Sequence, residues 1–429
     1  MNNLPELRAL GQLTRDGRLL ILGRLIRLFA FGASSVVLAL YFTEIGLSVI
    51  QVGLLLSAIL VGDTILSLLI TAGADRIGRR RMLLASTGLM LLSGMTLAFS
   101  THLIWIVLAA IIGTLSPTGN EVGPFLSIEQ ASLPQTTSDQ HRTSIFAWYN
   151  LLGSLSTAFG ALVGGSLVGM LQSQGYSALI SYRVIFIVYA SMGMLLAFSF
   201  YRLSKRIEPP PRTPLSKNDL DENGQSNFLR RLLGLHRSQK VVLKLSGLYM
   251  LDAFGGGLML QSLLAYWFYT RFGLSPVLLG STFFGANLLA GISALVAARI
   301  AAKIGLLNTM VFTHIPSNLL LMIVPLMPSA WLAVMVVLLR FSISQMDVPT
   351  RQSYAMAIVD ADERSAAAGL TSIARTAASA VAPTVTGQMF SMGFFSLPFW
   401  IGGGLKIVYD LILFYSFKSI KPPEEQNRL

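Results

Sequence analysis

The stretch Asp75-Arg76-Ile77-Gly78-Arg79-Arg80-Arg81 separates two long apolar segments that carry almost no charge of their own. Four arginines within six residues are too costly to place in hydrocarbon, so this stretch must be a tight polar loop between two membrane spans. Because positive charge collects on the cytoplasmic side of a membrane, the loop also fixes the orientation of the chain.

The composition excludes an ordinary soluble domain. Of the 429 residues, 53% are hydrophobic and 12% are charged, and the mean hydropathy is +0.64. These values are typical of a polytopic membrane protein. The net charge of +12 does not indicate nucleic-acid binding, because most basic residues fall in loops and tails on one side, with only Arg183 and Arg271 at the opposite face. We expect both termini in the cytoplasm and the chain in the inner membrane of a bacterial cell.

Twelve segments are apolar enough and long enough to cross a bilayer. They cover residues 19–43, 50–73, 82–100, 103–130, 144–171, 182–201, 241–269, 277–302, 309–327, 331–358, 365–390 and 397–417. The stretch 202–240 is polar and rich in proline, which is typical of a solvated linker. The sequence therefore predicts an N-terminal six-helix bundle (1–201), a cytoplasmic linker (202–240) and a C-terminal six-helix bundle (241–429).

An internal repeat supports this division. Aligning the halves lays Asp75-Arg76-Ile77-Gly78 on Ala302-Lys303-Ile304-Gly305, so that a basic residue followed two positions later by glycine recurs at the turn. A shift that is one residue shorter lays Glu121 on Asp347. Repeated halves are typical of transporters, in which substrate and ion sites lie near the bilayer midplane between the repeats.

The loop resembles the signature G-x-x-x-D-R-x-G-R-[RK] of the major facilitator superfamily, and the resemblance extends over the whole chain through the number of spans. Thr71 stands where the first glycine is expected. The matching positions are Asp75, Arg76, Gly78, Arg79 and Arg80. The resemblance implies an all-α polytopic fold of twelve transmembrane helices in two pseudo-symmetric six-helix bundles. It also implies that Asp75 and Arg79 belong to an inner latch; the alternative for these arginines is a simple positive anchor.

In this family, spans 1, 4, 7 and 10 line a central cavity and spans 2, 5, 8 and 11 flank it. The charged residues within the present spans concentrate there, namely Arg27, Asp63, Glu121, Asp252, Arg340, Asp347, Arg351 and Arg375. They could be buried salt bridges that only hold helices together, or acids that exchange a proton and arginines that hold an anionic group. Glu121 and Asp347 are the preferred proton carriers, because they occupy equivalent helices and each precedes a proline.

Two further features bear on transport. The glycines Gly153, Gly160, Gly164 and Gly169 resemble the antiporter signature G-x(6)-G-x(3)-G-P-x(2)-G-G, but Gly165 replaces its proline and Val168 replaces a glycine. Close helix packing explains such glycines equally well. On the last span, Lys406 and Asp410 are four residues apart and predict an intrahelical pair of structural role. We expect His314 to be a packing or interface residue rather than a proton relay.

The resemblance predicts a secondary transporter that works by alternating access. Proton-coupled efflux of a small organic compound is favoured by the glycines; the alternative is proton-coupled uptake of a small organic anion or zwitterion. From another class, a transporter-like sensor or scaffold would tolerate neutralised cavity charges. No nucleotide-binding loop, nucleophile–base spacing or metal-ligand cluster stands out, so we expect no enzyme activity, cofactor or metal. The expected partners are the substrate, protons and the lipid bilayer, with the protein a monomer.

Overall fold

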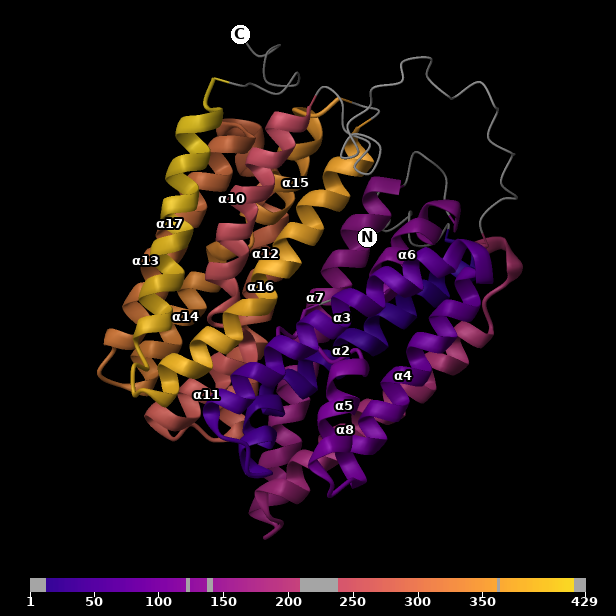
Figure 1. Cartoon of the computed structure of the whole chain (residues 1–429), viewed down its shortest axis with the longest axis vertical. Helices are drawn as coiled ribbons and strands as arrows, with labels where there is room; N and C mark the ends of the chain where they lie inside the picture. Colours follow the sequence, from indigo (N-terminus) through magenta and orange to yellow (C-terminus); the bar gives the residue numbers. More distant parts are fainter. Residues whose placement is uncertain (1–12, 121–123, 137–141, 209–237, 361–362, 420–429) are drawn as a thin grey trace, which may run out of the picture.

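The computed structural model describes residues 13–120, 124–136, 142–208, 238–360 and 363–419. It is helical, and its helices form two bundles of six crossing segments each, shown from indigo to magenta and from pink to yellow (Figure 1). The N-terminal half contains α2 (Arg15–Glu44), α3 (Val49–Ile77), α4 (Arg79–Phe99), α5 (Leu103–Ile112), α6 (Pro124–Ser132), α7 (Arg142–Ser173) and α8 (Ala178–Tyr201). The C-terminal half contains α10 (Gln239–Gly257), α11 (Gln261–Phe272), α12 (Pro276–Ile304), α13 (Leu306–Ile323), α14 (Ala330–Ser344), α15 (Asp347–Ala357), α16 (Arg364–Ser391) and α17 (Leu397–Phe417).

Ten helical stretches in the described part of the chain are long and apolar enough to cross a membrane. The α5–α6 pair and α16 complete twelve segments; α5 is short, and α16 is rich in Ser, Thr and Ala rather than large apolar residues. The predicted fold class is thereby confirmed. The domain limits stay a prediction, and most of the predicted linker, residues 209–237, lies outside the described residues.

Three of the predicted continuous spans are broken. The fourth span divides into α5 and α6, where Gly113 follows α5 and Thr114 has a φ of 56°. The seventh span breaks between α10 and α11 after a run of three glycines, and the tenth breaks at Gln345, with Pro349 in the first turn of α15. Glycine and proline weaken a helix interior, and an irregular backbone at membrane depth is tolerated where protein or a cavity surrounds it.

We call the end of the molecule with the last residue of α8 and the first residue of α10 the linker end. The turn between two helices at this end needs glycine in each half. Gly78 joins α3 to α4 with a φ of 111°, and Gly305 joins α12 to α13 with a φ of 89°. A side chain at either position would be strained. The structure therefore contains the turn that the internal repeat predicts.

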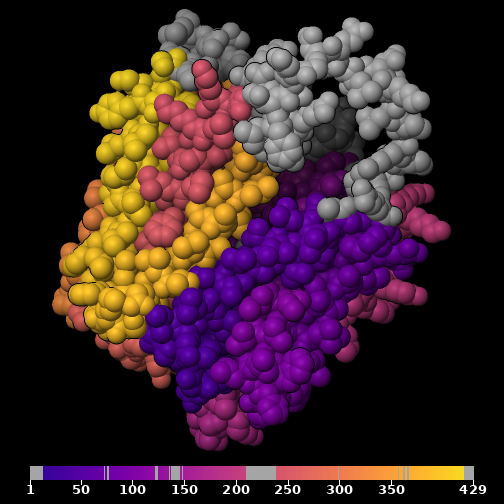
Figure 2. All heavy atoms as spheres, in the orientation of Figure 1, coloured from indigo at the N-terminus to yellow at the C-terminus, as the bar shows by residue number. Residues whose placement is uncertain are grey.

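The two halves pack through α3 against α16, α7 against α12 and α2 against α11. On the face drawn in Figure 2 they meet along an oblique seam between the indigo-to-magenta and the orange-to-yellow blocks. Two glycine pairs allow the close approach. A Cβ built on Gly53 would lie 2.9 Å from Cα of Gly387, and one built on Gly165 would lie 2.8 Å from Cα of Gly280. Any side chain at these crossings would force the halves apart.

Candidate functional site

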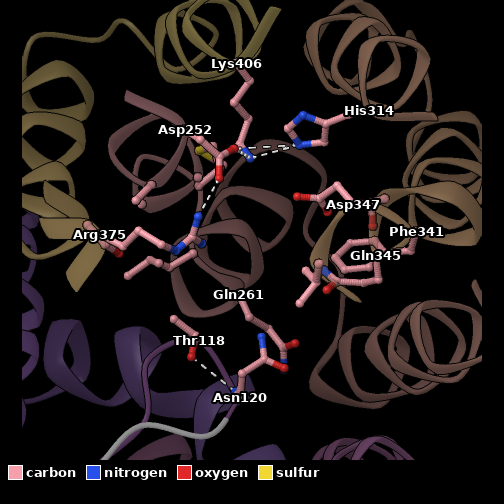
Figure 3. A pocket seen from close by; sticks show the side chains of 18 of the residues that line it. Thr118, Asn120, Asp252, Gln261, His314, Phe341, Gln345, Asp347, Arg375 and Lys406 are labelled. Carbon is pink, nitrogen blue, oxygen red and sulfur yellow. Dashed lines mark hydrogen bonds and ion pairs between the residues drawn. The ribbon is translucent and has the colours of Figure 1, made fainter. Parts of the chain in front are cut away.

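A cavity of about 370 Å³ lies between the two halves. Most of its wall belongs to the C-terminal half, and the N-terminal half contributes Leu60 of α3 together with Thr118 and Asn120 from the break between α5 and α6. Figure 3 shows charged side chains on one side of this space and neutral polar side chains on the opposite side. The broken spans thus surround the cavity.

Asp252 of α10 is the centre of the charged wall. Its Oδ1 accepts a hydrogen bond from Nζ of Lys406 at 2.7 Å, and its Oδ2 accepts one each from Nη1 of Arg351 and Nη1 of Arg375, both at 2.9 Å. The same Nη1 of Arg351 also donates to Oδ2 of Asp347 at 2.9 Å. One buried carboxylate therefore holds three cations that come from α15, α16 and α17.

Behind Lys406 the network continues to α13. Nδ1 of His314 lies 2.9 Å from Oδ1 of Asp410, and Nε2 of His314 lies 3.4 Å from Nζ of Lys406. Asn318 donates to Oδ2 of Asp410 at 3.3 Å. The prediction of an intrahelical Lys406–Asp410 pair is wrong, because Lys406 reaches across to Asp252 and Asp410 turns to α13. His314 is likewise not a simple packing residue, since both ring nitrogens face charged groups and the side chain lines the cavity (Figure 3).

Arg340 of α14 is the one lining arginine that the Asp252 network does not hold. Within the part of the chain that the structure describes, its Nε is buried without a hydrogen-bond partner and no carboxylate forms an ion pair with it. Its guanidinium carbon lies 5.1 Å from the ring centre of Phe341. Arg340 is therefore a cation with hydrogen-bonding capacity left for a ligand.

Neutral polar groups close the cavity toward the far end, the end opposite the linker. Nε2 of Gln261 donates to Oγ of Ser35 at 2.8 Å, and Oγ of Ser262 donates to the carbonyls of Ser35 and Pro117, each at 2.8 Å. Asn287 donates to Oε1 of Gln261 at 3.2 Å. These bonds join α2 and the α5–α6 connection to α11, so the two halves are tied together on this side of the cavity.

The N-terminal half has its own buried charge cluster, which we call the Arg27 triad (Arg27, Glu129 and Tyr149). Two nitrogens of Arg27 donate to the two carboxylate oxygens of Glu129 at 2.8 and 2.9 Å, and the Tyr149 hydroxyl donates to Glu129 at 2.5 Å. Side chains of Arg27 and Glu129 are both 0% exposed. The triad joins α2, α6 and α7, and Arg27 is thus engaged within its own half rather than at the cavity.

Of the eight charged residues expected at the cavity, five line it, namely Asp252, Arg340, Asp347, Arg351 and Arg375. Asp63 is buried on α3 and is not one of the described residues of the lining. Glu121, one of the two preferred proton carriers, lies outside the described residues. No group of three or more His, Asp, Glu or Cys in the described ranges is arranged to hold a metal ion.

Comparison with known proteins agrees with this architecture. The family model described as Major Facilitator Superfamily matches residues 20–383. The chain belongs to the major facilitator superfamily. It is also 30% identical over 436 residues to the "Uncharacterized membrane protein YJR124C" of Saccharomyces cerevisiae, with 97% of each chain covered.

Solved structures of transporters share the fold. The nucleoside transporter NupG superposes with a TM-score of 0.66 at 15% identity, covering 94% of this chain and 99% of that one. A D-xylose–proton symporter superposes with a TM-score of 0.69 at 16% identity, covering 93% of this chain and 96% of that one. The human organic anion transporter MFSD10 superposes with a TM-score of 0.62 at 18% identity, covering 96% of this chain and 100% of that one. Identities this low carry the fold alone, and it is the family match over residues 20–383 that makes the chain a membrane transporter of this superfamily.

The superfamily loop motif is held by a carboxylate that the sequence analysis did not assign. The backbone N–H groups of Arg79 and Arg80 donate to Glu208 at 2.6 and 3.2 Å, so Glu208 caps the N-terminus of α4. The Arg79 side chain donates to the carbonyls of Ala131 and Ile207, and Arg80 to that of Tyr201. These contacts join α4 to the ends of α6 and α8. Only the backbone is described at Asp75 and Arg76, so the latch assigned to Asp75 and Arg79 stays a prediction.

The glycines of α7 serve close packing on two faces. A Cβ on Gly160 would overlap the carbonyl of Phe29, and one on Gly164 would lie 2.8 Å from Cα of Ala33, both on α2. A Cβ on Gly153 would lie 2.6 Å from Nε of Arg24, also on α2, whereas one on Gly169 would overlap Val277 of α12. Packing therefore accounts for all four positions, and they give no independent indication of transport direction.

Sequence reasoning missed His314 and Lys406 as members of the cavity network, and Glu129 as the partner of Arg27. A signal was present for each, because an ionisable side chain inside a span needs a charged partner or water. What the sequence could not show is which helix supplies that partner. Lys406 and His314 lie on spans 12 and 9, which the family pattern places outside the cavity-lining set.

Proposed function

We propose that this chain is a proton-coupled secondary transporter that moves a small organic anion by alternating access. The observation that carries the proposal is the excess of positive charge at the cavity between the halves. Its described lining contains four basic side chains, Arg340, Arg351, Arg375 and Lys406, against two carboxylates, Asp252 and Asp347. A substrate with a carboxylate or phosphate group would balance this excess.

Arg340 is the residue that we assign to the anionic group of the substrate. Arg351, Arg375 and Lys406 are already held by Asp252, whereas the Arg340 guanidinium has donors to spare among the described residues. A guanidinium binds a carboxylate or phosphate through two parallel N–H bonds. The amide groups of Asn120 and Gln261 on the opposite wall would hold polar atoms of the same substrate.

The volume of the cavity supports a small ligand. About 370 Å³ lies near the lower limit of the range for small-molecule sites, roughly 300–1,000 Å³. The fold-level neighbours include a transporter of organic anions and a symporter of protons, which supports the class of activity but not the substrate.

Coupling to protons would use the carboxylates of the cavity. Protonation of Asp252 or Asp347 would weaken the hold on Arg351, and the freed guanidinium would rearrange as the halves rock. Asp347 was the preferred carrier from the sequence, and the ion pairs make Asp252 at least equally suited. Because packing explains the glycines of α7, the earlier preference for efflux has no support beyond the sequence motif, and direction is left to the assay.

A ligand screen followed by transport tests the proposal. Purified protein is heated in the presence of monocarboxylates, sugar acids, organic phosphates, amino acids and neutral sugars, because a ligand that binds the native state raises its melting temperature. We expect anions to raise it in wild type and in the exposed-surface control Arg299→Gln, and not in Arg340→Gln. Stabilisation by neutral compounds alone, or an anion effect that survives in Arg340→Gln, would refute the assignment.

The anion found by that screen is then followed in vesicles with an imposed inside-acid or inside-alkaline gradient. Accumulation under only one polarity gives both the coupling and the direction. Transport that is indifferent to either gradient would refute proton coupling, and binding without any transport would favour the sensor or scaffold.

A further inference from the structure

A buried histidine at the back of the Asp252 network has an arrangement suited to binding a proton. His314 of α13 lies between Asp410 and Lys406, and its side chain is 4% exposed. Nδ1 is 2.9 Å and 3.0 Å from the two oxygens of Asp410. Nε2 is 3.4 Å from Nζ of Lys406 and 3.8 Å from Oδ1 of Asp252.

These neighbours assign the tautomer of the neutral ring. Because Asp410 is an acceptor, the hydrogen-bond network places the imidazole proton on Nδ1. The lone pair of Nε2 then faces the Lys406 ammonium, which donates to Asp252 at 2.7 Å. The ring therefore presents a basic nitrogen to the ion pair that anchors the cavity network, with Nζ of Lys406 as its neighbour at 3.4 Å.

A proton added to Nε2 would change that ion pair. The imidazolium and the ammonium would be like charges only 3.4 Å apart, and both would compete for the same oxygen of Asp252. Lys406 would have to withdraw, and His314 would become a donor to Asp252. Asp252 would then bind His314 in place of Lys406 while it still binds Arg351 and Arg375. Because these arginines line the cavity, the change would reach the cavity wall.

The helices packed against α13 are α12, α14, α15 and α17, and α10 comes near His314 through Asp252. Besides Asp410 and Lys406, α17 contributes Tyr409, whose ring centre is 6.1 Å away, and α10 contributes Asp252 with Tyr249 nearby. The cavity wall adds Asp347 and Arg351 of α15 and Arg340 of α14. The basic residues of α12, Arg299 and Lys303, are exposed at its linker end.

We propose that His314, oriented by Asp410, is the site that takes up the coupling proton, and that Lys406 passes the effect to Asp252. This deepens the proposed function and rests on it, because the proton would be bound in one orientation of the halves and released in the other. His314 is one of the residues that line the cavity, so a proton in the cavity can reach its side chain. No bond is made or broken apart from the N–H bond, and the proton comes from water and returns to water.

The test follows the protein without any substrate. The chain contains no cysteine, so Lys205→Cys and Lys418→Cys accept spin labels selectively. Both positions are exposed; Lys205 is in the short helix that follows α8 and contacts α4 of the N-terminal half, and Lys418 follows α17 of the C-terminal half. Distances between the labels are measured from pH 5 to pH 9 in wild-type background, in His314→Gln and in His102→Gln. His102 is an exposed histidine and serves as the matched control. Ring signals of isotope-labelled histidine are recorded over the same range.

We expect the distance distribution to shift with pH in wild type and in His102→Gln, and the shift to be lost in His314→Gln. The ring signal that disappears in His314→Gln should titrate in this range, and in Asp410→Asn its midpoint should move to lower pH because the neighbouring negative charge is gone. A purely structural Asp410 would leave that midpoint unchanged. Should His314→Gln fail to fold, a variant that keeps His314 as the single histidine of the four identifies its signal, and recording that signal with and without Asp410→Asn decides the matter.

The outcomes separate the two proposals. A pH-dependent distance that persists in folded His314→Gln, or a His314 signal that does not titrate, overturns His314 as the proton site while proton coupling stands. A wild-type distance that does not respond to pH, together with transport indifferent to a proton gradient, overturns proton coupling and this inference with it.

Discussion

Neutralising one member of the Arg27 triad should destabilise the protein strongly. In Glu129→Gln the shape of the side chain is kept, but the guanidinium of Arg27, which is 0% exposed, loses its counter-charge and one of the two oxygens that accept its hydrogen bonds at 2.8 and 2.9 Å. Removing one partner of a buried ion pair costs about 3–5 kcal/mol, because the other charge is left buried. The Tyr149 hydroxyl can still donate to the amide oxygen of the glutamine, so its hydrogen bond should contribute little to the loss of stability.

The double variant Arg27→Met/Glu129→Met separates charge from packing. Replacing both members of a buried ion pair by apolar residues is often neutral or stabilising. In this protein the hydrogen bond that Tyr149 loses should lower the free energy of unfolding of the double variant by about 1 kcal/mol. The free energy of unfolding, measured in mixed micelles by tryptophan fluorescence, should therefore be lower in Glu129→Gln than in the double variant by about 2–4 kcal/mol.

The exposed acid at the end of α2 provides the control for this experiment. Glu44→Gln should change the free energy of unfolding by about 0.5 kcal/mol or less. A Glu129→Gln protein as stable as Glu44→Gln would refute the reasoning, since it would mean that water or another group compensates Arg27 in the folded state. A double variant less stable than Glu129→Gln would equally contradict it.

Three further predictions concern the contacts between helices and the loop motif. Gly280→Leu should cost about 1–3 kcal/mol of folding free energy and reduce transport, because the new side chain meets Gly165 and the carbonyl of Ala161 across the two halves; melting temperature and vesicle transport measure this. Glu208→Gln should lower the free energy of unfolding by about 0.3–1 kcal/mol, the contribution of a negative charge at a helix N-terminus, and high salt should reduce the difference. Asp75→Asn should impair transport while membrane insertion, read from yield in the membrane fraction, is unchanged; a fully active variant would remove the latch.

The sequence was sufficient for the class of fold because the bilayer imposes it. Spans of about 20 apolar residues, the arginines around Gly78 and the repeat at Gly305 depend only on local chemistry, and the structure contains each of them. The breaks in spans 4, 7 and 10 were missed although glycine and proline mark them. The segments on both sides of each break are apolar, so hydropathy alone shows each span as one continuous segment.

The site was predicted less completely, because partner choice is a tertiary property. Periodicity placed Lys406 and Asp410 on one helical face, where a pair four residues apart is favourable. Instead Asp252 and His314, on two other helices, provide closer partners at 2.7 and 2.9 Å. A buried charge takes the arrangement that satisfies most of its hydrogen bonds, and only the packing of α10, α13 and α17 decides which groups come within reach.

The internal repeat allows the buried polar networks of the two halves to be compared. In each half the first span is joined through buried polar side chains to the linker-end part of the fourth span and to the fifth. In the N-terminal half the members are the Arg27 triad on α2, α6 and α7. In the C-terminal half they are Asp252 on α10, Arg351 on α15 and Arg375 on α16.

The same connection is thus made with the signs of charge exchanged. The N-terminal triad contains one cation, one anion and a hydroxyl, which bind one another and are not among the described residues of the cavity lining, so a ligand in the cavity does not contact them. The C-terminal set places two arginines on one carboxylate that already binds Lys406, and its surplus positive charge faces the cavity. Because the Asp252 network faces the cavity, where a proton or an anion can rearrange it, we expect substitutions at Asp252 to change transport, whereas those at Glu129 should act mainly through stability.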